Sequence, residues 1–114
     1  MDDCIFCKIA AGEIPCARVY EDGDILAFND IRPQAPVHVL IIPKAHVAVG
    51  TMEVTPENSA LVGRCFEVAA KIAEELHVTE GFRVATNNGP GAWQSVPHIH
   101  FHLIAGRELS PIMG

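Results

Sequence analysis

The sequence predicts an α+β domain with a sheet of about five mostly antiparallel strands, one long helix and one short helix. Its 114 residues match the size of one compact domain, so we expect residues 1–114 to form a single unit. Short apolar segments are separated by Gly and Pro at regular intervals, which is typical of a mixed domain. One segment near the middle instead has apolar residues at helical spacing, and the sequence contains no internal repeat.

The N-terminal part predicts a short helix followed by a hairpin. We expect the helix over residues 6–11, with Gly12 ending it. Two apolar segments, residues 17–21 and 25–29, then flank the pair Asp22-Gly23. An Asp-Gly pair between two strand-like segments is a strong signal for a β-hairpin, because both residues tolerate the backbone conformation of the turn.

The middle of the chain predicts a central strand and then the long helix. Residues 37–42 are nearly all apolar, and Pro43 closes the segment, so we expect a strand covered on at least one face. Over residues 56–76 apolar side chains return at steps of three and four, with Thr55 as the expected N-cap and Pro56 in the first helical position. The apolar face of this helix consists of Leu61, Cys65, Val68, Ala69, Ile72 and Leu76.

The C-terminal part predicts two further strands, residues 82–87 and 96–105, which a loop at residues 88–91 separates. The last strand alternates with period two, so its two faces differ. One face carries His98, His100 and His102, and the other carries Ile99, Phe101 and Leu103. We expect the apolar face to pack on the long helix and the imidazole face to be exposed or functional, because three adjacent imidazoles do not stabilise a sheet.

The spacing of the three histidines limits what they can do together. Neighbours on one face of a strand lie about 7 Å apart and the outer two about 13 Å apart, whereas metal–nitrogen bonds are only about 2 Å long. One ion cannot bind all three rings. Some of them can bind a metal, and at least one remains free to act as a base, an acid, a nucleophile or a phosphate contact.

Charge and composition exclude several classes of function. Eight Lys and Arg residues against 14 Asp and Glu residues give a net charge of -6, which is the wrong sign for binding a nucleic-acid duplex through its phosphates. A small nucleotide remains compatible with this charge. No apolar segment is long enough to span a membrane and no secretion signal is found, so we expect a cytoplasmic protein without membrane contact.

Several segments resemble one known family. His98-Ile99-His100-Phe101-His102-Leu103-Ile104 is similar to the signature of the histidine triad (HIT) superfamily, in which histidines alternate with apolar residues. The similarity continues at Cys4-Ile5-Phe6-Cys7-Lys8-Ile9, Phe28-Asn29-Asp30-Ile31, Pro36-Val37-His38, Ile42-Pro43-Lys44-Ala45-His46 and Gln94-Ser95-Val96, in order along nearly the whole chain. The short length and the first Cys-x-x-Cys resemble the Hint branch, the histidine triad nucleotide-binding proteins, and its bacterial members in particular.

The resemblance implies a fold and a reaction. It implies a HIT-like fold whose sheet continues across a homodimer. It also implies a hydrolase that cleaves the P–N bond of purine nucleoside 5'-phosphoramidates, which are amine conjugates of AMP or GMP. By this resemblance His100 is the nucleophile that forms a nucleotidyl-histidine, His102 and His38 line the phosphate, and Ser95 assists the departing amine.

The resemblance also implies a nucleotide site. Asp30 matches the residue that accepts hydrogen bonds from the ribose hydroxyls, although its position before Ile31-Arg32-Pro33 also suits a turn-forming aspartate. The expected apolar walls around the base are Ile5, Phe6, Phe28 and Ile31, with Asn29 beside them. The expected polar groups around the phosphate are Asn87, Gln94, Ser95, His100 and His102.

The cysteines suggest a metal site. Cys4 and Cys7 have the spacing of a zinc knuckle, and the spacing alone also allows a redox pair or two buried thiols. The resemblance implies that His46 and His98 complete a structural Zn²⁺ site. Cys16 and Cys65 have no partner by spacing, so we interpret both as structural residues.

Two departures from the family and three alternative functions remain open at this point. Trp93 stands where relatives usually carry a small residue, which suggests a narrowed pocket or a covered leaving group, and the tail from Glu108 to Gly114 lacks the aromatic residues of some relatives. The alternatives are a dinucleoside polyphosphate hydrolase, a nucleotide-binding regulatory module with vestigial catalysis, and a hydrolase in which zinc activates water. We further expect imidazolium groups to supply the positive potential of the pocket, so that phosphate binding weakens as the pH rises from 5 to 8.

Overall fold

The structure is a computed structural model that describes residues 3–112, and it contains a five-stranded sheet with the strand order β1-β2-β3-β5-β4. All four strand pairs are antiparallel. The elements are α1 (Ile5–Ala10), β1 (Arg18–Glu21), β2 (Ile25–Asn29), β3 (Val37–Pro43), α2 (Ser59–Glu75), β4 (Phe82–Ala85) and β5 (Phe101–Ala105), with 3-10 turns η1 (Thr51–Glu53) and η2 (Pro90–Ala92). The predicted α+β class is therefore confirmed.

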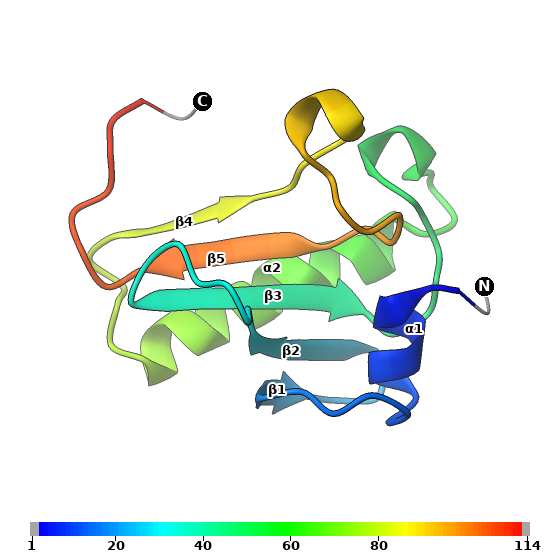
Figure 1. Ribbon diagram of the computed structural model, residues 1–114, viewed down its shortest axis with the longest axis horizontal. Helices are drawn as coiled ribbons and strands as arrows, with labels where there is room; N and C mark the ends of the chain where they lie inside the picture. The colour runs from blue at the N-terminus through cyan, green and yellow to red at the C-terminus, as the bar shows by residue number, and fades with distance from the viewer. Residues whose placement is uncertain (1–2, 113–114) are drawn as a thin grey trace.

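The two helices cover opposite faces of the sheet (Figure 1). Because side chains alternate along a strand, β2 and β3 supply apolar residues to both faces. The face toward α2 contains Ile25, Ala27, Val39, Ile41, Ile99, Phe101 and Leu103, packed on Val62, Cys65, Val68, Ala69 and Ile72. The face toward α1 contains Leu26, Phe28, Leu40 and Ile42, packed on Cys4 and Phe6. As predicted, the apolar side chains that alternate with the histidines pack on the long helix.

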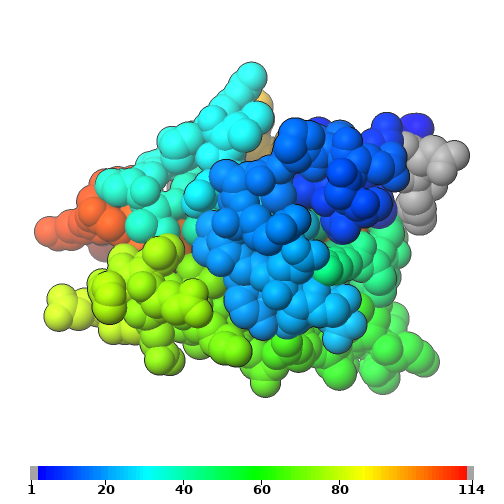
Figure 2. All heavy atoms as spheres, turned by 90° about the horizontal axis from the view of Figure 1, so that it is seen from below, coloured from blue at the N-terminus to red at the C-terminus, as the bar shows by residue number. Residues whose placement is uncertain are grey.

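The β1–β2 hairpin forms at the predicted Asp-Gly turn and lies against α2. Figure 2 shows the two together, with the hairpin in blue and the helix in green. The Asp22 carboxylate accepts hydrogen bonds from the backbone N–H groups of Asp24 and Ile25, both at 2.8 Å, and pairs with Arg64 of α2. The Lys71 ammonium of α2 lies 5.6 Å from the centre of the Tyr20 ring. These contacts fix the hairpin to the helix surface.

Helix α2 begins at Ser59 rather than at residue 56, and Asn58 is its N-cap in place of Thr55. The preceding residues form a turn in which the Asn58 N–H donates to the Thr55 carbonyl at 3.1 Å. The Asn58 side chain stabilises this turn, because its Oδ1 accepts from the Thr55 N–H at 2.8 Å and its Nδ2 donates to the Glu53 carbonyl at 3.0 Å. A hydrogen-bonded turn that the Asn58 side chain closes back onto Thr55 therefore replaces the predicted first helical turn.

Strand β5 begins at Phe101 rather than at residue 96. The His98 N–H donates to the Val96 carbonyl at 2.9 Å in a bend, and the Ile99 N–H donates to the Ala48 carbonyl at 2.9 Å instead of joining the ladder with β3. Of the three triad histidines, only His102 lies in a strand. Strand β4 likewise ends at Ala85 rather than at residue 87, and α1 covers Ile5–Ala10 with Cys4 as its N-cap.

No helix within residues 3–112 combines the length and the apolar character that crossing a membrane requires.

Candidate active site

Two of the triad histidines, His98 and His100, lie under α1 and are shielded from solvent, whereas His102 is half-buried. His98 is 0% exposed and His100 is 4% exposed, because Phe6 of α1 packs edge-on against both rings at centroid distances of 5.8 and 5.0 Å. The strand pattern predicted an imidazole face that is either exposed or functional. The structure buries that face, so its polar nitrogens need specific partners.

Four predicted metal ligands come together at the N-terminus of α1. One ligand atom from each of Cys4, Cys7, His46 and His98 lies within 4.8 Å of the others. The sulfur–nitrogen distances are 3.3 Å for Cys4 and His98, 3.4 Å for Cys7 and His46, and 3.6 Å for Cys7 and His98. A tetrahedral Zn²⁺ with ordinary bond lengths separates its sulfur and nitrogen ligands by roughly 3.5 Å. The geometry therefore fits a zinc ion.

The protonation of these ligands also fits a metal. The His98 Nε2 lies 2.8 Å from the Pro43 carbonyl, which can only accept, so the ring proton is on Nε2 and the Nδ1 lone pair faces the two sulfurs. Without a cation, burial and the adjacent Cys4 raise the pKa of the Cys7 thiol to about 11. Two thiolates at this site therefore require a compensating positive charge.

His100 has the properties of a neutral nucleophile. Its Nδ1 donates to the His98 carbonyl at 2.8 Å, which leaves the lone pair on Nε2. Burial lowers the pKa of His100 below its ordinary value of 6.5, against the opposing effects of the His98 carbonyl and the Asp30 carboxylate. The ring is uncharged at neutral pH, and contacts with Phe6 and His102 fix its orientation.

A chain of hydrogen bonds determines the proton positions on His38 and His102. The backbone N–H of Gln34 donates to His38 Nδ1 at 3.0 Å, so the His38 proton is on Nε2. This Nε2 lies 2.9 Å from His102 Nδ1 and donates to it, which places the His102 proton on Nε2. That second nitrogen is buried without a hydrogen-bond partner among the described residues. The result is a free N–H donor next to His100, as a phosphoryl oxygen would require.

The same chain argues against a second metal site. Asp30, His38 and His102 also bring ligand atoms within 4.8 Å of one another. The His38 nitrogen that faces the other two groups carries the proton fixed by Gln34, so it has no lone pair for a cation. His38 Nε2 instead lies 3.4 Å from Asp30 Oδ2, within reach of a weak hydrogen bond.

Asp30 forms the turn that the sequence suggested, and its second carboxylate oxygen is not used in that turn. Its Oδ1 accepts from the Arg32 N–H at 2.8 Å, as a turn-forming aspartate does. Its Oδ2 lies near His38 at the edge of a cavity. The turn therefore fixes the carboxylate and leaves one oxygen able to accept from a ligand.

This cavity of about 320 Å³ opens between α1 and the end of β2. Seven predicted nucleotide contacts line it, namely Ile5, Phe6, Phe28, Asn29, Asp30, Ile31 and Ser95. The cavity is also lined by four residues that were not predicted to contact a nucleotide, Ile9, Arg32, Leu40 and Val96. Ile9 follows Ile5 by one helical turn, which is a signal that the sequence contains, whereas Leu40 reaches the cavity only because β3 pairs with β2 opposite Phe28.

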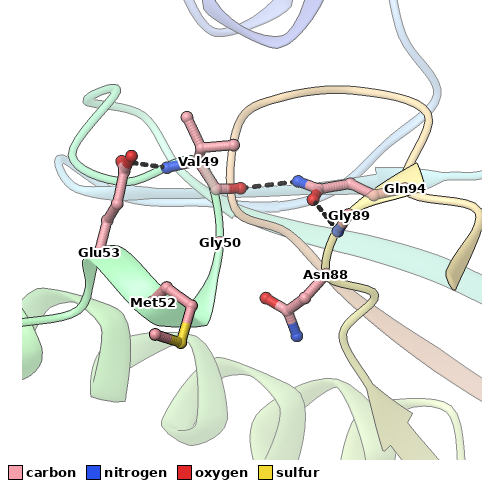
Figure 3. A pocket seen from close by; sticks show the side chains of 7 residues that line it. All are labelled: Val49, Gly50, Met52, Glu53, Asn88, Gly89 and Gln94. Carbon is pink, nitrogen blue, oxygen red and sulfur yellow. Dashed lines mark hydrogen bonds between the residues drawn. The ribbon is translucent and has the colours of Figure 1, made fainter. Parts of the chain in front are cut away.

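The remaining predicted phosphate contacts differ in their surroundings. Ser95 is exposed at the cavity, and Asn87 is half-buried just beyond β4. Gln94 precedes Ser95 in the chain, and its side-chain amide forms hydrogen bonds with the backbone of Gly89 and Val49, as Figure 3 shows. Trp93 has a left-handed backbone with φ of 62° and is 89% exposed, and it lines neither this cavity nor the smaller one beside Gln94.

The sequence led us to expect charged imidazolium groups in the pocket, whereas the structure favours neutral imidazoles. Burial, together with the adjacent His100 and His38, lowers the pKa of His102 to about 4. His100 is also shifted toward the neutral form, chiefly by burial. Desolvation disfavours charged imidazole, so these rings act at neutral pH through N–H groups and lone pairs.

Comparisons with known proteins agree with this geometry. A profile of the HIT domain family matches residues 11–109. The purine nucleoside phosphoramidase of Escherichia coli K12 is 44% identical over 114 residues, which cover 98% of this chain and 94% of that protein. The 14 kDa zinc-binding protein of Brassica juncea is 45% identical over 109 residues, which cover 95% of this chain and 96% of that protein. The crystal structure of a HIT family hydrolase from Legionella pneumophila superposes with a TM-score of 0.92 at 47% identity, covering 96% of this chain and 97% of that chain.

Proposed function

The chain belongs to the HIT family and is a hydrolase, and from this premise we propose that it cleaves the P–N bond of purine nucleoside 5'-phosphoramidates. The observation that carries the proposal is the unprotonated Nε2 of His100, whose ring packs on Phe6, a residue that lines a cavity of about 320 Å³. A neutral imidazole is a good nucleophile, and a cavity of this size suits a nucleoside.

The reaction proceeds in two steps. His100 Nε2 attacks the α-phosphorus, and the bond from phosphorus to the amine nitrogen breaks as the new N–P bond forms. The exposed Ser95 hydroxyl gives its proton to the departing amine and recovers a proton in the second step from the attacking water. Water then attacks the nucleotidyl-histidine, which releases the nucleoside monophosphate and restores neutral His100. Across both steps one water is consumed, and one amine and one monophosphate are formed.

The neighbouring residues stabilise the phosphoryl group and orient the nucleoside. The unpartnered Nε2–H of His102 donates to a phosphoryl oxygen, where negative charge builds up in the transition state. His38 acts on the phosphate through His102, since its own Nε2–H is used in holding that ring. Asp30 Oδ2 accepts from a ribose hydroxyl, and the base lies between the apolar side chains of Phe28 and Ile31.

The decisive experiment is to trap the intermediate. After rapid quenching with adenosine 5'-phosphoramidate, mass spectrometry is expected to detect an adenylyl group on His100. The His100→Gly variant is expected to form no adduct and to lose at least about 10³-fold in kcat, as nucleophile removal generally does.

Other outcomes would support other functions. Full turnover by the His100→Gly variant would refute the nucleophile assignment. Tight binding of AMP without turnover or adduct in the wild type would support a regulatory module. A strong preference for diadenosine polyphosphate over the phosphoramidate would support a dinucleoside polyphosphate hydrolase.

We further propose that the ion at Cys4, Cys7, His46 and His98 is Zn²⁺ in a structural role. All four positions of a tetrahedral site have a protein ligand, so no position remains for a catalytic water. When bound, zinc supplies the positive charge that two thiolates need. The protein's own residues then connect this site to the chemistry, because the carbonyl of the ligand His98 fixes the tautomer of His100. Reduced thiols at this site accord with a cytoplasmic location, which we expect for the protein.

A further inference from the structure

Two loops, one of which contains Ser95, enclose a small cavity of about 180 Å³. The first loop, residues 47–54, follows the metal ligand His46, and the second, residues 88–95, leads to Ser95. Figure 3 shows the residues that line the cavity, namely Val49, Gly50, Met52, Glu53, Asn88, Gly89 and Gln94. Side-chain amides from the second loop bond directly to the backbone of the first.

The Gln94 amide is fully engaged by backbone groups. Its Nε2 donates to the Val49 carbonyl at 2.7 Å and to the Val96 carbonyl at 3.1 Å. Its Oε1 accepts from the Gly89 N–H at 2.8 Å. A glutamine amide has two N–H groups, and both are used here. Gln94 can therefore donate to a phosphate oxygen only by breaking one of these bonds.

Asn88 forms a second link between the loops. Its Oδ1 accepts from the Thr51 N–H at 2.6 Å. This approach requires glycine at position 50, because a Cβ there would lie 2.7 Å from Asn88 Oδ1, closer than such atoms approach in proteins. Gly50 has a φ of -161°, an extended conformation that any residue can adopt. Glycine is therefore needed here because there is no space for a side chain, and not because of the backbone conformation.

The first loop is itself held firmly against the active strand. The Ala48 carbonyl accepts from the Ile99 N–H at 2.9 Å, between the metal ligand His98 and the nucleophile His100. The Val49 N–H donates to the Glu53 carboxylate at 2.8 Å. The links from Gln94 and Asn88 therefore attach the second loop, and with it Ser95, to a support that is fixed relative to His100.

We propose that Gln94, Asn88 and Gly50 form a loop clamp that positions Ser95 and the 88–95 loop for the phosphate, with Gln94 as a positioning residue rather than a phosphate ligand. The catalytic consequence rests on the proposed function, whereas the clamp itself does not. A misplacement of about 1 Å in a positioning element can cost about 10²-fold in rate. The clamp therefore matters for turnover although none of its members touches the reacting atoms.

The first test is the Gly50→Ala variant, which pushes Asn88 away without altering any residue of the catalytic site. We expect kcat for adenosine 5'-phosphoramidate to fall about 10- to 100-fold, with a smaller change in KM and an unchanged melting temperature. The matched control is Gly91→Ala in the second loop, where a Cβ meets nothing within 4 Å. This control is expected to keep wild-type kinetics.

A double-mutant cycle identifies the contact responsible. Asn88→Ala removes the oxygen that the new methyl group would meet, so Gly50→Ala is expected to have little further effect on kcat in that background. Additive losses in the double variant would mean that Gly50 acts through some other contact, which would overturn the clamp as described.

Hydrogen exchange tests the clamp without reference to catalysis. Asn88→Ala is expected to speed exchange of the Thr51 amide at least about tenfold, because that N–H loses its acceptor. Gln94→Glu keeps an acceptor for the Gly89 N–H but loses both donors, so it is expected to lower kcat while Gly89 stays protected. Unchanged Thr51 exchange in Asn88→Ala would refute the clamp. A second pair of results would also refute the clamp: Gln94→Glu raises only KM, and Gly50→Ala keeps wild-type kinetics. These results would mean that Gln94 binds phosphate directly.

The two proposals fail separately. If the wild type does not hydrolyse phosphoramidates but the Thr51 exchange responds as expected, the proposed function fails and the clamp stands.

Discussion

The position of each ring proton decides what each histidine can do. The backbone fixes three of these protons, since Gln34 N–H donates to His38, and the carbonyls of Pro43 and His98 accept from His98 and His100. In each ring one nitrogen bonds to the backbone and fixes the orientation, and the other nitrogen faces a different group. Similar side chains thus present either an N–H group or a lone pair, as the donor, metal-ligand and nucleophile roles that we propose for them require.

The charge state of His102 can be measured directly. Its pKa of about 4, lowered from 6.5 mainly by burial, means that the folded protein holds fewer protons than the unfolded chain between these two pH values. Stability from this group is therefore fully present above pH 6.5 and is lost as the pH falls toward 4. NMR titration of the ring resonances, assigned with a His102→Asn variant, is expected to give a midpoint near 4. A midpoint near the ordinary pKa of 6.5 would instead agree with the positively charged pocket that the sequence suggested.

Trp93 is a residue whose backbone and side chain are in conflict. Its φ of 62° suits glycine, and its side chain is 89% exposed and buries little apolar area. We expect Trp93→Gly to be more stable than Trp93→Ala by about 1 kcal/mol in urea unfolding, because only glycine relieves the backbone strain. Equal stabilities of the two variants would show that the left-handed conformation costs nothing here.

At the scale of elements, the short helix α1 connects the metal site to the active site. Its N-cap Cys4 and its residue Cys7 are two of the ligands that we propose for zinc, and Phe6 between them packs on His98, His100 and Phe28. An isolated helix of this length is not stable in water. The position of α1 therefore depends on tertiary contacts and on the ion that we propose.

Removal of zinc is expected to destabilise this arrangement. A chelator is expected to lower the melting temperature, since a ligand at 1,000 times its Kd stabilises the folded state by about 4 kcal/mol. Cys4→Ser is expected to lower it similarly and to abolish the chelator effect. Cys16→Ser, the same substitution at a half-buried thiol outside the ligand set, is expected to retain the effect. A chelator effect on turnover with no effect on melting would instead favour catalytic zinc.

At the scale of the whole molecule, the sheet has two open edges, β1 and β4. Phe82 at the start of β4 is 37% exposed, and an open edge strand tends to pair with another chain. The family resemblance led us to expect a homodimer with one continuous sheet, and this remains a prediction. Sedimentation equilibrium at micromolar concentration is expected to give twice the mass of one chain, and a monomer mass would contradict it.

The sequence by itself determined the features that depend on local periodicity. Alternation in residues 98–103 and helical spacing at Cys65, Val68 and Ile72 correctly identified side chains that meet in the core. The same spacing wrongly included Leu76, which is 41% exposed at the C-cap of α2, and missed Val62. The Asp-Gly pair located the hairpin. The spacing of Cys4 and Cys7, together with His46 and His98 that the family resemblance added, supplied a ligand set whose atoms the structure brings within 4.8 Å of one another. An apolar face can be identified from the sequence because it must be buried, whichever segment packs on it.

Only the tertiary structure decided the proton positions and the contacts between loops. The Cys4–His98 contact spans 94 residues and the Gln94–Val49 bond spans 45. Nothing near Gln94 in the sequence indicates that the Val49 carbonyl accepts a hydrogen bond from its amide, and nothing near His102 reveals that burial lowers the pKa of its ring. Hydrogen-bond partners and desolvation depend on which distant segments the fold brings together, so local sequence determines the residues of this site but not their tautomers or partners.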